Sequence, residues 1–153
     1  MYFSISILSA FATALSASAI PRSSVVPLSD DQSPVSPYFT DFYNCHGSSM
    51  CPTVKVQACD VAVNHKLIRD DVLNYGSEWS GAPHRGVCKG IHTDYGCGIF
   101  IDGPGNCTRT GNNIWQDYQE IRQHGCHRCG FKQWTEWGCQ TKIDYFPVCG
   151  IWH

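Results

Sequence analysis

The sequence predicts an α+β fold, a disulfide-rich α/β sandwich in which two helices cover one face of a mostly antiparallel sheet. Two observations lead to this prediction. Alternating apolar segments and segments with helical periodicity follow one another in the order strand, helix, strand, strand, helix, strand. The chain of 153 residues also carries ten cysteines, all from Cys45 onward, which is a high content for one domain.

The N-terminal 42 residues are expected to lie outside the folded domain. Residues 1–19 predict a secretory signal peptide, because a short apolar run ends at Ala17-Ser18-Ala19, a small-residue cleavage pattern. Residues 20–42 contain four prolines and five serines without apolar periodicity, which is typical of a disordered leader or pro-segment. The domain is therefore expected to span residues 43–153.

Periodicity indicates the first two elements of this domain. The alternating, β-branched run at 53–59 predicts a strand. Apolar residues then recur at helical spacing, which predicts a helix that starts at Asn64 as N-cap and stops at Gly76. The residues that carry this helical pattern are Leu67, Ile68, Asp71, Val72 and Tyr75.

The second half of the domain is expected to add a hairpin, a helix and a final strand. A glycine-rich loop at 76–86 leads into strands at 86–91 and 95–101, and residues 102–106 have the composition of a turn. A second helix is expected to start at Asn112 or Asn113 and to end at Gly125. Its predicted buried face is Ile114, Trp115, Tyr118 and Ile121, and its solvent face is Gln116, Glu120 and Gln123. Residues 131–137 are aromatic and remain unassigned, and alternation at 140–148 predicts the last strand.

Secretion decides how the cysteines are interpreted. In an oxidising compartment an even number of cysteines favours five disulfides over metal thiolates. Cys45 and Cys51 lie around a glycine-serine turn, and Cys126 and Cys129 follow the second helix. Two disulfides between the first pair of cysteines and the second pair would clamp the start of the domain to the end of that helix. The C-x-x-C form of Cys126–Cys129 also occurs in redox and zinc sites, but no second such motif is present, so no metal is expected.

Charge and motif content argue against several functions. From Cys45 onward, ten acidic residues balance ten basic ones, so no electrostatic signal for nucleic-acid binding is present. Seven histidines occur without a nucleophile or paired-carboxylate motif, so no catalytic residue and no cofactor are predicted.

Two surface features remain as candidates for binding and modification. Trp134 and Trp137 flank Glu136 and would form either an exposed stacking platform for a sugar or partner or part of the core, and packing is the more common role of tryptophan. Asn106-Cys107-Thr108 is an N-glycosylation sequon in a predicted turn.

Four blocks of the sequence resemble the killer toxin Kp-four/SMK family, and the resemblance spans roughly residues 43–149. They are Tyr43–Cys51 with the spacing N-C-x-G-S-S-x-C, Val56–Cys59, Gly86–Cys88, and Gln123–Gly130 with the block H-G-C-x-x-C-G. The resemblance implies a secreted fungal or viral α/β sandwich with the pairs Cys45–Cys126, Cys51–Cys129 and Cys88–Cys149. For the remaining four cysteines we expect the pairs Cys59–Cys107 and Cys97–Cys139.

The resemblance also implies a function, namely a secreted, non-enzymatic toxin that inhibits competing or host cells through a cell-surface target such as a calcium channel. The position of the family's functional lysine is Gly86 here, so Arg85 and Lys89 are expected to supply the cation that contacts the target. An alternative is an effector that binds cell-wall polysaccharide or a host protein through Trp134 and Trp137, and a weaker one is a secreted hydrolase. A monomer without stable membrane insertion is expected.

Overall fold

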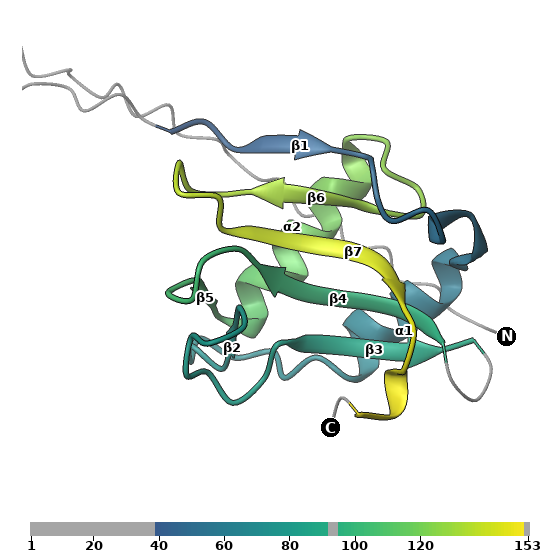
Figure 1. Ribbon diagram of the computed structural model, residues 1–153, viewed down its shortest axis with the longest axis horizontal. Helices are drawn as coiled ribbons and strands as arrows, with labels where there is room; N and C mark the ends of the chain where they lie inside the picture. Colours follow the sequence, from purple (N-terminus) through teal and green to yellow (C-terminus); the bar gives the residue numbers. More distant parts are fainter. Residues whose placement is uncertain (1–38, 92–94, 152–153) are drawn as a thin grey trace, which may run out of the picture. The chain divides into compact units, whose positions relative to one another are not determined.

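The computed structural model describes residues 39–91 and 95–151, which form an α+β sandwich with two helices behind one antiparallel sheet (Figure 1). The sheet has five strands in the order β1-β6-β7-β4-β3, and β2 and β5 form a separate two-stranded sheet. The predicted fold class is confirmed. In chain order the elements are β1 (Phe42–Asn44), the 3-10 helix η1 (Cys51–Thr53), α1 (Val56–His65), β2 (Tyr75–Gly76), β3 (Gly86–Gly90), β4 (Gly96–Asp102), β5 (Thr108–Arg109), α2 (Gly111–Gln123), β6 (Gly130–Gln133), β7 (Gln140–Phe146) and the 3-10 helix η2 (Cys149–Ile151).

The described residues begin close to the predicted start of the domain. The predicted signal peptide, most of the predicted leader and the connection at 92–94 lie outside them. Strand β1 starts at Phe42, so the last residue assigned to the leader already pairs with β6 through the register Phe42–Gln133. No helix in the described part of the chain is long and apolar enough to cross a membrane.

The strand predicted at 53–59 is wrong, because this segment contains the last residue of η1 and the first turn of α1. The residues that α1 buries are Cys59, Ala62 and Val63, which lie on one side of a helix and not on alternate sides of a strand. Val54 and Val56 produced the apparent alternation, yet only Val54 is buried. Packing of α1 against β3 and β4 therefore overrides the weak β-propensity of the segment.

The helix predicted from Asn64 to Gly76 is also wrong, because α1 ends at His65 and irregular structure follows. A local hydrogen-bonding turn competes with the helix here: the Asp70 carboxylate accepts hydrogen bonds from the Val72 backbone N–H and the Asn74 amide. Val72 is 59 % exposed, so the residues with helical spacing do not form a buried face.

The core lies between the sheet and the helices. Ile99 in the interior strand β4 pairs with Val87 of β3 and Ile143 of β7, and all three side chains are buried beneath the helices. Burial of a side chain of this size contributes about 1.5–3 kcal/mol relative to exposure. This row ties the two predicted strands of the hairpin to the predicted final strand.

Helix α2 largely follows its prediction. Ile114, Tyr118 and Ile121 are buried, Trp115 is half-buried, and the Thr110 hydroxyl caps the first turn by accepting the Asn113 N–H. The helix ends before Gly125, whose φ of +86° is a left-handed conformation that favours glycine. The expectation that Glu120 faces solvent is wrong, because its carboxylate lies against β1 and β6.

The ten cysteines form five disulfides. The clamp is present as Cys45–Cys126 and Cys51–Cys129, and Cys88–Cys149 joins β3 to η2, as the resemblance implied. The other two assignments, Cys59–Cys107 and Cys97–Cys139, are wrong, and the actual pairs are Cys59–Cys97 and Cys107–Cys139.

The misplaced first strand explains half of this error. Cys59 belongs to α1, which covers β4, so its partner is Cys97 of that strand. The other pair follows from register. Asp102 in β4 pairs with Gln140 in β7, so the loop after Asp102 and the residue before Gln140 lie next to each other.

Candidate functional site

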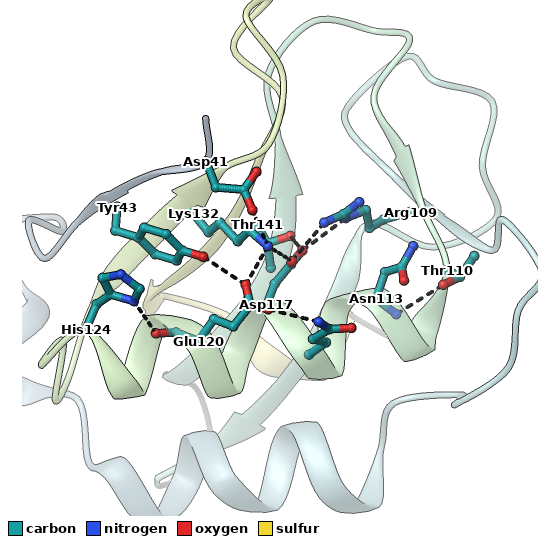
Figure 2. A network of polar contacts seen from close by, with 11 residues as sticks. Asp41, Tyr43, Arg109, Thr110, Asn113, Asp117, Glu120, His124, Lys132 and Thr141 are labelled. Carbon is teal, nitrogen blue, oxygen red and sulfur yellow. Dashed lines mark hydrogen bonds and ion pairs between the residues drawn. The ribbon is translucent and has the colours of Figure 1, made fainter. Parts of the chain in front are cut away.

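A cluster of charged side chains surrounds Lys132 between α2 and the edge of the sheet that is formed by β1 and β6 (Figure 2). The Lys132 ammonium is almost fully buried and contacts three carboxylates, those of Asp41 at 2.8 Å, Asp117 at 3.0 Å and Glu120 at 2.5 Å. Burial alone would lower the pKa of Lys132, but hydrogen bonds and ion pairs with these carboxylates outweigh it and raise that pKa.

Asp117 is the buried centre of the same cluster. Its oxygens accept two hydrogen bonds from the Arg109 guanidinium, at 2.8 and 3.0 Å, and one from the Thr141 hydroxyl. A bidentate pair of this kind fixes orientation as well as charge. Arg109 follows Thr108 in β5, so Asp117 connects α2, the small sheet and β7.

Glu120 and Tyr43 complete the cluster on its exposed side. Burial opposes ionisation of Glu120, but hydrogen bonds donated by Lys132, Tyr43 and Gln116 lower the pKa of its carboxyl. Burial and the hydrogen bond to Glu120 raise the pKa of Tyr43 to about 12. The ring of His124 stacks on Tyr43 with centroids 3.6 Å apart.

Every charged group of this cluster is engaged by another, so the arrangement stabilises the fold and does not present a reactive group. An ammonium held by three carboxylates is a poor nucleophile, and a carboxylate held by a guanidinium is a poor base. The cluster instead holds β1 and β6 against α2. Within residues 39–91 and 95–151, no group of three His, Cys, Asp or Glu side chains is placed to hold a metal ion.

The two cations predicted to contact a target lie at the β3 edge of the sheet. Arg85 is part of an exposed ion pair with Glu78, at 3.3 Å. Lys89 is exposed and lines a shallow cavity of about 220 Å³ together with Lys55.

Of the two predicted platform tryptophans, only Trp137 is displayed. Trp134 packs against the core and lies under the Arg109 guanidinium, which is 4.4 Å from its ring. Trp137 is 73 % exposed at the tip of the β6–β7 turn. That turn is closed by hydrogen bonds from the backbone N–H groups of Gly138 and Cys139 to Thr135.

A second displayed tryptophan, Trp79, is not predicted by any pattern in the sequence. It is 89 % exposed in the β2–β3 loop, and its φ of +69° places it in the left-handed region. A bulky residue in this conformation is an outlier that costs about 1–2 kcal/mol. The only signal for it in the sequence is a large aromatic residue within a glycine-rich loop.

One turn, residues 103–106, contacts the loops that carry both exposed tryptophans. A Cβ atom on Gly103 would lie 2.7 Å from the Gly138 carbonyl oxygen, and one on Gly105 would lie 3.4 Å from the Trp79 Cβ. Figure 1 shows that the β2–β3, β4–β5 and β6–β7 loops lie at the same end of the sheet. We call Trp79, Trp137 and the 103–106 turn the tryptophan end.

A disulfide and several hydrogen bonds hold the tryptophan end in place. The Cys107–Cys139 disulfide joins the turn to the β6–β7 loop, and Ser77 donates its backbone N–H to the Cys107 carbonyl oxygen at 2.9 Å. Asp117 holds Arg109, which in turn covers Trp134 next to the turn that presents Trp137. The two exposed rings are therefore mounted on ordered loops, which lowers the entropy lost on binding.

Comparison with protein families identifies the relationship of this chain. Residues 43–149 match the model of MU117, the meiotically up-regulated gene family, over more than half of the chain. The chain belongs to the MU117 family. No curated protein and no solved structure matches it.

Membership of MU117 corrects the resemblance drawn from the sequence. The assignment to the killer toxin Kp-four/SMK family is wrong, because the matching model is that of a different family over the same residues. The calcium-channel target rested on that resemblance alone. The description of MU117 refers to regulation in meiosis and names no molecular activity.

Proposed function

We propose that this protein is a secreted, non-enzymatic binding protein that recognises polysaccharide through the tryptophan end. Five disulfides support an extracellular or other oxidising environment. The observation that carries the proposal is the display of two tryptophans, 89 % and 73 % exposed, at one end of the sheet. The Cys107–Cys139 disulfide holds the loop of Trp137, and a hydrogen bond from Ser77 to Cys107 holds the loop of Trp79.

Polysaccharide suits this surface better than a protein partner does. A stable protein interface needs a packed, largely apolar core within about 1,200–2,000 Å² of buried surface. At the tryptophan end, two indole rings are mounted on separate loops, with a glycine-containing turn contacting both. A flat ring packs well against the C–H face of a sugar, while the hydroxyls at the sugar's rim remain free to bond to backbone and carboxylate oxygens.

The proposal is tested by sedimentation of the purified protein with insoluble chitin, β-1,3-glucan and cellulose. We expect the wild type to be retained by at least one of them. Replacement of Trp79 and Trp137 by alanine should lower the affinity by about tenfold or more, since loss of a central tryptophan contact commonly costs about 2 kcal/mol and about 1.4 kcal/mol corresponds to tenfold.

A matched control removes exposed apolar side chains elsewhere. Ile68 and Leu73 are 47 % and 58 % exposed in the loop after α1, and their double replacement by alanine should leave retention unchanged. Loss of binding in this control, equal binding by the double tryptophan variant, or no retention of the wild type by any of the three polysaccharides would each refute the proposed function.

A further inference from the structure

The exposed turn of the tryptophan end contains the sequon Asn106-Cys107-Thr108. Asn106 is exposed, and no hydrogen bond from its side chain occurs among the described residues. The backbone N–H of Cys107 donates to the Pro104 carbonyl oxygen at 3.1 Å, which closes a tight turn and presents Asn106 outward from it. The acceptor amide of the sequon is thus open to solvent.

The same turn is attached to the loop that carries Trp79. Ser77, two residues before Trp79, donates its hydroxyl hydrogen to the Pro104 carbonyl oxygen and its N–H to the Cys107 carbonyl oxygen. Gly105 lies next to Trp79, because a Cβ atom on this glycine would be 3.4 Å from the Trp79 Cβ and 3.5 Å from the Trp79 carbonyl oxygen. A sugar chain that leaves Asn106 therefore begins beside the exposed indole of Trp79.

We propose that Asn106 carries an N-linked glycan that lies against Trp79, so that occupancy of this sequon controls access to the tryptophan end. The inference that occupancy controls access to the tryptophan end rests on the proposed polysaccharide binding. The donor is a lipid-linked oligosaccharyl diphosphate. The Asn106 amide nitrogen forms a bond to the anomeric carbon, the bond from that carbon to the diphosphate oxygen breaks, the amide loses a proton, and the lipid diphosphate leaves.

Folding limits the time available for this transfer. In the folded protein Cys107 is 1 % exposed and bonded to Cys139, and Thr108 is paired with Gly76 between β2 and β5. The sequon is then fixed in one conformation. Transfer must precede closure of the Cys107–Cys139 disulfide, and this competition predicts that glycosylated and unglycosylated molecules are secreted together.

The first measurement is the intact mass of the full chain secreted from a eukaryotic host, before and after treatment with a peptide N-glycosidase. We expect a glycoform that this enzyme removes and that is absent from the Asn106→Gln and Thr108→Ala variants. The Thr108→Ser variant keeps a functional sequon and should keep the glycan. Absence of any glycoform from the wild type, or its persistence in Asn106→Gln, overturns the proposal.

The second measurement tests the position of the glycan. Oxidation of tryptophan by N-bromosuccinimide, mapped by peptide mass, should be several-fold slower at Trp79 in the glycoform than in Asn106→Gln. Trp137 is mounted on a different loop and serves as the internal reference. Equal oxidation of Trp79 in both forms refutes contact between the glycan and this ring.

Sedimentation with polysaccharide separates the two proposals. Stronger retention of Asn106→Gln than of the glycoform supports control by occupancy, and equal retention of both forms overturns that control. Absence of retention in both forms refutes the proposed function and its control by the glycan. The mass measurement then still decides whether Asn106 carries a glycan, and the oxidation measurement decides whether that glycan lies at Trp79.

Discussion

At the scale of single residues, Trp79 is the position where this protein departs furthest from what folding alone favours. The side chain leaves most of its apolar surface in water, and the backbone adopts a conformation suited to glycine or asparagine. Strain of this kind persists where the surrounding structure imposes it and is concentrated at functional sites. Here Ser77 and the 103–106 turn impose it.

A pair of variants measures this strain. Neither Trp79→Gly nor Trp79→Ala keeps the indole, so their difference reports the backbone alone. We expect Trp79→Gly to be more stable than Trp79→Ala by about 1 kcal/mol, because glycine adopts positive φ without a steric penalty while its unfolded chain gains some entropy. Equal free energies of unfolding in urea would show that the loop relaxes and that Trp79 is not strained.

At the scale of elements, α2 holds the N-terminal strand of the domain against the sheet. Its last turn is followed by Cys126 and Cys129, which clamp β1 and η1. Its central turns carry Asp117 and Glu120, which hold Lys132 of β6. A single helix therefore positions the N-terminal edge strand by covalent and ionic contacts together.

Replacement of Lys132 by methionine should lower the free energy of unfolding by about 3 kcal/mol or more, because it leaves Glu120 without a cation and removes one of the two cations that hold the buried carboxylate of Asp117. Lys142 offers a matched control. Its side chain is 26 % exposed and forms one ion pair, with Asp144 at 3.3 Å, so Lys142→Met should cost less than about 1 kcal/mol. Urea unfolding with the disulfides intact provides the comparison, and similar losses in the two variants would contradict a structural role for the cluster.

At the scale of the whole molecule, different disulfides hold different parts of the domain. Cys45–Cys126 and Cys51–Cys129 fix the N-terminal segment, Cys59–Cys97 fixes α1 to β4, and Cys107–Cys139 braces the tryptophan end. The last pair belongs to the same buried cluster as Val87, Ile99 and Ile143, but its cysteines lie just beyond the β4–β7 pair Asp102–Gln140, where the loops begin.

Removal of Cys107–Cys139 by alanine at both positions should therefore act locally. The closed loop has a sequence separation of 32, for which chain entropy predicts a loss of about 3–4 kcal/mol. Amide hydrogen exchange should increase in the loops at 77–85, 103–107 and 134–139, while β4 and β7 remain protected. Faster exchange throughout the five-stranded sheet would show that this disulfide supports the core as well.

The parts of the fold that were predicted correctly are those with strong local signals. Helix α2 has an apolar face over about two turns and a glycine stop, β3 and β4 are short apolar runs between turns, and β7 has an alternating pattern. The segment at 53–76 was predicted wrongly for two reasons. Packing of α1 against β3 and β4 overrides the strand pattern, and the hydrogen-bonded turn at Asp70 replaces the helix predicted after it. The candidate site was found only in part, through Trp137 and Asn106.

The sequence by itself determined the fold class, the second helix, the hairpin and the existence of five disulfides, because periodicity and cysteine content are local or compositional properties. Only the tertiary structure decided that Cys59 pairs with Cys97, that Lys132 lies among three carboxylates and that Trp79 and Trp137 are carried by loops at one end. These features depend on strand register and on which helix covers which strands. Such contacts join residues far apart in the chain, and no local pattern specifies them.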